Sequence, residues 1–289
     1  MNPLDMIERR IRELPTLPLV AQRVVGLLDN PNSSAADLEQ VIKHDQALTA
    51  RVLRLVNSAY YGYPRHITTV GQAIVILGYK TLKELVLSIS ITDLFRMKGG
   101  ARVFNRAALW QHAVATAIGA RILTRRAGLP FEEDVFIAGL LHDIGIIILD
   151  LCLKTEFDEI ANLVTAGGMP LIRAEEKVLG FNHAQVGRMV AEKWNFPSFL
   201  VEVIRYHHRP VQTRNHWLAA ALVFLADNLA QETGVGFLEG YDAGPDFTTT
   251  VWTWLELKPE QKPEVLQRIK EELRGAVEFL ALCSKEHEI

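Results

Sequence analysis

The chain has 289 residues, a formal net charge of −3, and 49% apolar and 22% charged residues. This composition is typical of a folded globular protein and excludes an intrinsically disordered chain. The small net charge gives no global argument for nucleic acid or an anionic membrane as a partner. Two cysteines, Cys152 and Cys283, are too few for a disulfide framework. Because the N-terminal segment also lacks the apolar core of a signal peptide, we expect a cytoplasmic protein.

Helical patterns dominate the N-terminal part of the chain. Ser33 and Ser34 are both possible N-caps of a helix, and Asp37 follows Ser34 at the spacing of a capping box. Thr81 and Glu84 predict a second helix start of the same kind. We find no segment of useful length in which apolar and polar residues alternate, as they do in a half-buried strand. Apolar residues recur instead at intervals of three and four, as at Leu17, Val20, Val24, Leu27 and Leu28.

The glycine-containing segment 97–103 is the best internal boundary, and the glycine-rich segment 234–247 precedes a last helical pattern. We therefore predict an all-α protein with an N-terminal helical lobe (1–98), a second helical lobe (101–233) and a C-terminal helical appendage (234–289). In the second lobe, helices are expected at 105–127, 132–150, 154–166, 170–179, 184–194, 198–208 and 215–232.

One apolar stretch, residues 135–153, approaches the length of a membrane span. His142, Asp143 and Asp150 interrupt it with titratable side chains, which are costly in a bilayer. A buried core helix is the better interpretation, and we expect no membrane partner.

Histidine and aspartate side chains in the second lobe form a candidate metal site. Imidazole nitrogen and carboxylate oxygen are the ligands expected for iron, manganese, nickel or zinc. Seven such groups exceed the needs of one ion and suit two ions that share a bridging carboxylate. The candidate ligands are His112, His142, Asp143, His183, His207, His208 and Asp227.

Each of these residues also has a purely structural interpretation. A lone histidine on an apolar helix face is usually a hydrogen-bonded core residue, and Asp227 alone suits a solvated helix face. The His207–His208 pair suits a helix C-terminus, just ahead of Pro210. The ensemble favours a metal site. A second His–Asp dipeptide, His44–Asp45, lies outside the second lobe. Its aspartate directly precedes a helical pattern and is expected to be the N-cap of that helix. We therefore assign this pair no metal role.

The order and spacing of several motifs resemble the HDOD domain, the HD-related output domain of bacterial signalling proteins. The likeness runs from about Leu14 to about Pro210, and we expect it to continue to Asp227. The motifs are LPTLPLVAQRVVGLL, DQALTARVLRLVNSAYYG, ITTVGQAIVILGYKTLKELVLS, LWQHAVATA, AGLLHDIG, FNHAQVGRMVAEKWNFP and VIRYHHRP. The resemblance implies an HD-domain-like helical bundle with an additional N-terminal lobe. It further implies that Asp143 bridges two metals, that the histidines divide between them, and that a metal-bound water attacks a phosphodiester if the protein is an enzyme.

The resemblance also implies a relationship to the HD phosphohydrolases and the HD-GYP cyclic-dinucleotide phosphodiesterases, which are metal-dependent enzymes. Three positions depart from the pattern of these hydrolases. Ile146 stands where these enzymes commonly have a lysine that meets substrate phosphate, and Ala108 stands where a glutamate ligand is sometimes found. Arg209 follows the paired histidines in place of an acidic residue, and the GYP signature of the HD-GYP phosphodiesterases is missing. The metal site is therefore retained more fully than the residues that handle substrate.

We therefore favour a bacterial signal-transduction output module that acts through contacts with signalling proteins and retains a site for one or two divalent transition metals. The alternatives are a metal-dependent phosphohydrolase acting on a cyclic dinucleotide or nucleotide, with Asp143 in its catalytic centre, and a sensor that binds a nucleotide without hydrolysing it. Arg205, Arg209 and Lys154 are candidate phosphate contacts, although a solvated surface role is the simpler interpretation for each.

Overall fold

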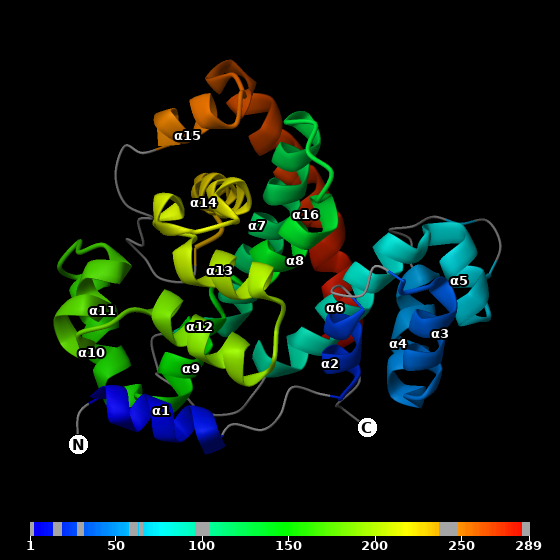
Figure 1. Ribbon diagram of the computed structural model, residues 1–289, viewed down its shortest axis with the longest axis horizontal. Coiled ribbons are helices and arrows are strands. Elements are labelled where there is room, and N and C mark those ends of the chain that lie inside the picture. The colour runs from blue at the N-terminus through cyan, green and yellow to red at the C-terminus, as the bar shows by residue number, and fades with distance from the viewer. Residues whose placement is uncertain are drawn as a thin grey trace. The chain divides into compact units, whose positions relative to one another are not determined.

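The computed structural model describes residues 3–13, 19–27, 32–57, 63, 66–95, 104–236 and 248–284, and every regular element in these ranges is a helix (Figure 1). The predicted all-α class is confirmed. The chain groups into a larger unit, Met1–Pro15 with Leu94–Lys270, and a smaller unit, Thr16–Asp93 with Glu271–Ile289. The predicted three-part division stays a prediction, and its first boundary at 97–103 lies outside the described residues.

Short helices that pack on one another form the smaller unit. The elements are α2 (Leu19–Gly26), α3 (Ala35–Lys43), α4 (Gln46–Val56), α5 (Val70–Leu77) and α6 (Tyr79–Phe95), of which α6 belongs to this unit up to Asp93. The helix α3 packs against α2, α4 and α5, and α4 packs against α5. Leu38, Ile42 and Val52 are fully buried between these helices and exclude water from the core.

Of the three helix starts that the sequence predicts in the smaller unit, two are confirmed. The Ser34 hydroxyl accepts a hydrogen bond from the Asp37 backbone N–H, and the Asp37 carboxylate accepts one from the Ser34 N–H at 2.8 Å, so the predicted capping box is confirmed. Asp45 caps α4 by accepting from the Leu48 N–H at 2.9 Å, as predicted. The prediction that a helix starts at Thr81 is wrong. Gly78 ends α5 with a positive φ of 86°, and α6 begins directly after it at Tyr79.

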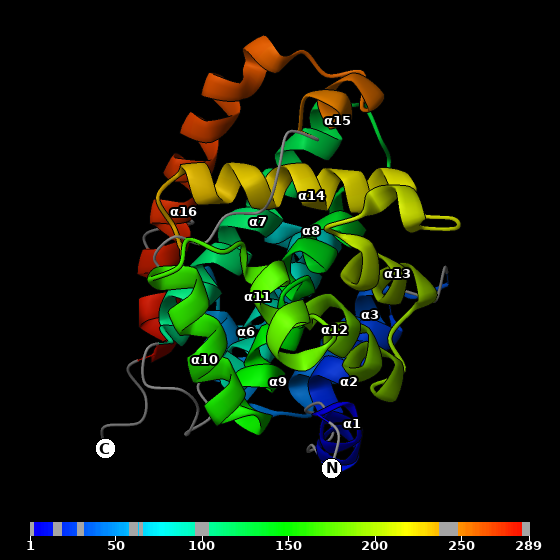
Figure 2. The same ribbon diagram turned by 90° about the vertical axis from the view of Figure 1, so that its left-hand side faces the viewer.

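The larger unit is a bundle whose central layer consists of α7, α8 and α14, which pack against one another (Figure 2). Around them, α12 packs on both α9 and α13, and α1 packs on α9 and α12. The elements are α1 (Pro3–Glu13), α7 (Arg106–Arg126), α8 (Glu132–Leu141), α9 (Ile144–Cys152), α10 (Lys154–Thr165), α11 (Leu171–Leu179), α12 (His183–Lys193), α13 (Ser198–Tyr206), η1 (Pro210–Gln212), α14 (Trp217–Glu232), α15 (Thr248–Trp254), η2 (Pro259–Gln261) and α16 (Lys262–Ser284), of which α16 belongs to this unit up to Lys270.

The single long helix expected over residues 132–150 is in fact two helices, α8 and α9, separated by His142 and Asp143. The Asp143 backbone, with φ −96° and ψ 14°, lies outside the helical range. Among the described residues, Glu132–Cys152 is the one stretch long and apolar enough to cross a bilayer, yet 89% of its most apolar window is buried within the protein. Such burial is expected of core helices and agrees with the predicted core role.

Glycine allows the helices of the larger unit to approach closely. A Cβ atom at Gly139 of α8 would lie 2.9 Å from the Ala117 Cα atom of α7, and one at Gly145 of α9 would overlap the His183 carbonyl oxygen of α12. Both contacts involve backbone atoms, which cannot rotate away. The two glycines thus bring the α8–α9 junction against α7 and α12, and this junction carries His142 and Asp143.

Candidate metal centre

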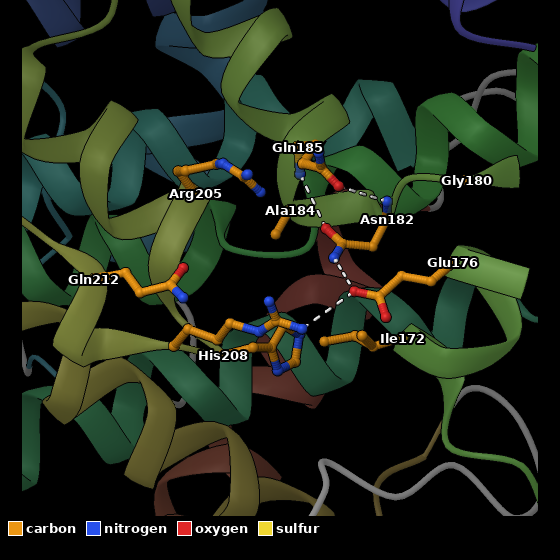
Figure 3. Close-up of a pocket in the computed structure, with 10 residues that line it drawn as sticks. Ile172, Glu176, Gly180, Asn182, Ala184, Gln185, Arg205, His208 and Gln212 are labelled. Atoms are coloured by element: carbon orange, nitrogen blue, oxygen red, sulfur yellow. Dashed lines mark hydrogen bonds and ion pairs between the residues drawn. The ribbon is translucent and has the colours of Figure 1, made fainter.

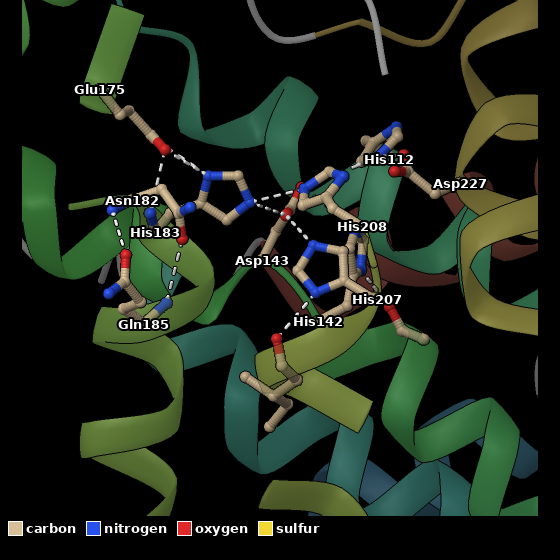
Figure 4. Close-up of polar contacts among 12 residues, drawn as sticks. His112, His142, Asp143, Glu175, Asn182, His183, Gln185, His207, His208 and Asp227 are labelled. Carbon is tan, nitrogen blue, oxygen red and sulfur yellow. Dashed lines mark hydrogen bonds and ion pairs between the residues drawn. The ribbon is translucent and has the colours of Figure 1, made fainter. Parts of the chain in front are cut away.

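The seven predicted ligand residues lie together inside the larger unit (Figure 4). They come from the middle of α7 and α14, from the α8–α9 junction, from the first residue of α12 and from the end of α13. Six are buried, with at most 2% of the residue surface exposed, and His208 is half-buried. The residues are His112, His142, Asp143, His183, His207, His208 and Asp227. Helices distant in sequence therefore aim nitrogen and oxygen atoms at a common point.

Asp143 stands at the centre of this cluster. Its Oδ1 atom lies 3.3 Å from the Nε2 atom of His183 and 3.6 Å from that of His207. Its Oδ2 atom lies 3.1 Å from the Nε2 atom of His142 and 3.7 Å from that of His112. The two oxygens of one carboxylate thus face two different pairs of histidines.

The histidines accordingly form two groups that share Asp143. One group contains Asp143, His183, His207 and His208, and the other contains Asp143, His112 and His142; within each, the potential ligand atoms lie within 4.8 Å of one another. Asp227 adjoins the second group, since its Oδ1 atom is 3.0 Å from the His112 Nε2 atom. A carboxylate shared between two sets of nitrogen donors is the arrangement that a two-metal site requires.

The outer nitrogens of three histidines fix the direction of their inner nitrogens. The Nδ1 atom of His142 contacts the Gly139 carbonyl oxygen at 2.7 Å, and that of His207 contacts the Ile204 carbonyl oxygen at 2.8 Å. The Nδ1 atom of His183 lies 2.8 Å from a Glu175 carboxylate oxygen. Since these oxygens only accept hydrogen bonds, each Nδ1 carries the proton and a neutral ring keeps its Nε2 lone pair toward the centre. Metal-binding histidines have this outer support.

Several inner atoms of the cluster lie close together without hydrogen-bond geometry. Among the described residues, no hydrogen-bond partner is found for either oxygen of Asp143, for the Nε2 atoms of His142 and His207, or for one oxygen of Asp227. A buried polar atom left in this way costs about 1–3 kcal/mol. Divalent cations on the two sides of Asp143 would satisfy these atoms, so the residues present fit transition metals with mixed nitrogen and oxygen ligands.

The charges of the cluster reinforce one another. Burial alone would raise the pKa of Asp143, but the nearby imidazoles of His142, His183 and His207 hold it well below its usual value. Burial opposes protonation of His183, yet the Glu175 and Asp143 carboxylates raise its pKa to about 10. Burial lowers the pKa of His207. Without metal, the His183 ring therefore carries a second proton in addition to the one on its Nδ1 atom, and a metal would have to displace this second proton.

Glu175 belongs to this site, although sequence reasoning missed it. Its side chain is fully buried on α11, and its carboxylate accepts hydrogen bonds from the His183 backbone N–H at 2.9 Å and from the His183 ring. The available signal was periodicity, because Glu175 lies four residues after Leu171 and four before Leu179, on the apolar face of α11. A charged residue on such a face requires a buried partner.

A pocket of about 360 Å³ adjoins the cluster at His208 (Figure 3). Two of the three candidate phosphate contacts, Arg205 and Arg209, line it, whereas Lys154 is exposed at the start of α10 and lies outside the lining. Ile146, which stands in the place of the hydrolase lysine, is fully buried in α9. The pocket is thus lined by cations from the end of α13 and not from α9.

Comparison with known proteins assigns the chain to a family. Residues 14–210 match the HDOD domain. The crystal structure of an HDOD domain protein of unknown function from Geobacter sulfurreducens is 29% identical, with 98% of each chain covered and a TM-score of 0.76.

Other similarities support the fold. A candidate signal transduction protein from Marinobacter aquaeolei VT8 is 24% identical with a TM-score of 0.78, covering 98% of this chain and 65% of that one. A candidate phosphohydrolase from Shewanella amazonensis SB2B is 24% identical with a TM-score of 0.72, covering 93% and 95%. An uncharacterized protein from Treponema pallidum (strain Nichols) is 26% identical over 208 residues, which are 70% of this chain and 39% of that protein, so the chain spans about two fifths of the curated relative it matches. With the HDOD match extending over more than half of its length, the chain belongs to the HDOD domain family.

Proposed function

We propose that the chain is a cytoplasmic bacterial signal-transduction output module, which acts through contacts with signalling proteins and holds one or two divalent transition metals in its larger unit. The observation that carries the metal proposal is the position of Asp143, whose two oxygens face separate pairs of histidines. Membership of the HDOD family supports the signalling role, as does the similarity in fold to a candidate signal transduction protein.

The ligands divide between the two sides of Asp143. His183, His207 and His208 would hold a metal on one side, and His112, His142 and Asp227 would hold one on the other. Because these residues come from α7, α12, α13, α14 and the α8–α9 junction, a bound metal would tie the helices of the larger unit together. Iron, manganese, nickel and zinc all accept this set of nitrogen and oxygen donors.

A second candidate function is metal-dependent phosphohydrolysis, and the pocket at His208 favours it. A hydrolase needs a metal centre that substrate can reach, and His208 both belongs to one ligand group and lines the pocket. A bound metal would supply Lewis-acid activation of water or of a phosphate ester. In this function Asp143 would position the metals, and cyclic dinucleotides or nucleotides are the substrate class.

Metal analysis of protein purified without a histidine tag tests the proposal. We expect metal in the wild type, loss of that metal in Asp143→Ala, and retention in Asp45→Ala, which alters the other His–Asp dipeptide of the chain. Far-ultraviolet circular dichroism checks that each variant is folded. Folded wild-type protein that binds no iron, manganese, nickel or zinc would refute the metal centre.

Turnover separates the two functions. Hydrolysis of bis-nitrophenyl phosphate or a cyclic dinucleotide by the wild type, abolished in folded Asp143→Ala, would support the phosphohydrolase. Bound metal without turnover under each of the four metals would support the output module. Asp45→Ala serves as the matched control in both assays, because its carboxylate only caps α4.

A further inference from the structure

We propose that the pocket beside His208 binds a small phosphorylated molecule and that Arg205 is the principal contact of its phosphate group. The proposal deepens the proposed function and rests on it in part, because the pocket ends at a proposed metal ligand. Its volume of about 360 Å³ falls within the range of about 300–1,000 Å³ that is usual for small-molecule sites.

The walls of the pocket come from α11, α12, α13 and the segment that follows α13. Arg205 lies in the last turn of α13, His208 follows the end of this helix, and Gln212 lies in η1. Gln185 of α12 and Glu176 of α11 form the facing wall. In Figure 3 the side chains of Arg205 and Gln212 extend from their backbone into the space between these walls. Ligand contacts from α13 would thus meet polar groups from α11 and α12.

The one carboxylate of the lining, that of Glu176, is already neutralised. Its Oε1 atom accepts from Arg209 at 3.2 Å and from the Asn182 side-chain amide at 3.2 Å, and its Oε2 atom accepts from Arg173 at 3.3 Å. Two guanidinium groups therefore surround a single carboxylate, and Glu176 leaves no uncompensated negative charge to repel an anion.

Arg205 is the cation of the pocket that remains available. No carboxylate among the described residues lies within ion-pair distance of its guanidinium group, which stands 5.5 Å from the centre of the Tyr206 ring. The positive charges of Arg188 and Arg209 act on Arg205 and add to the local positive potential. The half-buried position of Arg205 limits the screening of that potential by solvent.

These properties suit an oxyanion such as phosphate. A guanidinium group presents a planar fork of donors that matches two phosphate oxygens, and such charge-assisted hydrogen bonds are stronger than neutral ones. The side-chain amides of Gln185 and Gln212 offer polar contacts to the remainder of a ligand. Because His208 lines the same pocket, the bound ligand would lie beside the proposed metal centre.

Isothermal titration calorimetry with glycerol 3-phosphate, inorganic phosphate and phosphate-free glycerol tests the proposal on the untagged, full-length protein. We expect both phosphates to bind and glycerol not to bind. Arg205→Gln should weaken phosphate binding by about tenfold or more, and Arg205→Lys, which keeps the charge but not the fork, by less. The matched control is Arg125→Gln, which removes an exposed arginine paired with Glu132 outside the pocket and should leave affinity unchanged. Should Arg205→Gln fail to fold, Arg205→Lys decides.

Titrations of chelator-treated and metal-loaded samples, with metal content measured on each, separate this proposal from the metal centre. Phosphate binding that depends on Arg205 in protein without metal affinity would uphold the pocket and refute the metal centre. Bound metal together with phosphate binding that is equal in Arg205→Gln and Arg125→Gln would refute the pocket alone. The absence of phosphate binding to folded wild-type protein in both states would also refute it.

Discussion

A single methyl group at Gly145 tests whether the contact between α9 and α12 positions the metal centre. A Cβ atom there would lie 2.7 Å from the Gly187 backbone nitrogen and closer still to the His183 carbonyl oxygen. Cβ atoms essentially never approach other heavy atoms within 3.0 Å. Gly145→Ala therefore forces α9 and α12 apart, by several tenths of an ångström at Gly187 and by more at His183.

The displacement has two measurable consequences. Overpacking of this kind costs about 1–3 kcal/mol, and the upper end applies at Gly145 because the clashing atoms are backbone atoms. For a domain of this size each kcal/mol lowers the melting temperature by about 2–4 °C. Metal–ligand distances tolerate only about 0.2 Å of error. Because the clash moves His183 itself, metal affinity should fall by about tenfold or more.

Thermal melting and metal titration of wild type and Gly145→Ala measure both effects. The matched control is Gly26→Ala at the end of α2, where an added Cβ meets nothing within 4 Å. This control should be neutral or stabilising by up to about 1 kcal/mol, because alanine favours helix over glycine. A Gly145→Ala protein with the melting temperature and metal affinity of the wild type would show that the close helix contact does not position His183.

Three further predictions concern buried charges. Glu175→Gln should weaken metal binding by about 10–100-fold, because the His183 ring loses the carboxylate that orients it, whereas Glu176→Gln should not; equal affinities would contradict this role. Burial alone would lower the pKa of His183, but Glu175 outweighs burial and helps raise it to about 10. Metal affinity should therefore rise with pH toward that value, with proton release detectable by calorimetry in buffers of different ionisation enthalpy; a pH-independent affinity would contradict it. Asp150→Ala breaks a buried ion pair with Arg106, 2.5 Å long, and should destabilise by about 3–5 kcal/mol; an unchanged melting curve would disprove this.

Features set by neighbouring residues could be predicted from the sequence. The capping box of Ser34 and Asp37 and the N-cap Asp45 involve atoms three residues apart, so a short sequence window contains every group that forms them. The helices themselves follow from apolar spacing, because each buries one face. The seven residues now found together were predicted as a set, since their residue types and order carried the resemblance to the HDOD domain.

Features set by distant contacts could not be predicted. The break between α8 and α9 depends on the His142 ring, which contacts the Gly139 carbonyl, and on Asp143, which meets residues from other helices. Periodicity alone continues through this point. Glu175 was missed for the same reason, because its partner His183 lies beyond the end of its own helix. At Gly78, a positive φ moved a helix start ahead of the predicted capping box.

The buried position of Ile146 changes how its departure from the hydrolase pattern should be weighed. Ile146 is fully enclosed in α9, so a lysine there would place an ammonium group in the core at a large desolvation cost. Position 146 is thus part of the packed core, and a lysine introduced there would not provide a phosphate contact. Arg205 reaches the pocket from α13, by a different route. The missing lysine therefore argues against the hydrolase way of holding phosphate, but it does not argue against a phosphate ligand.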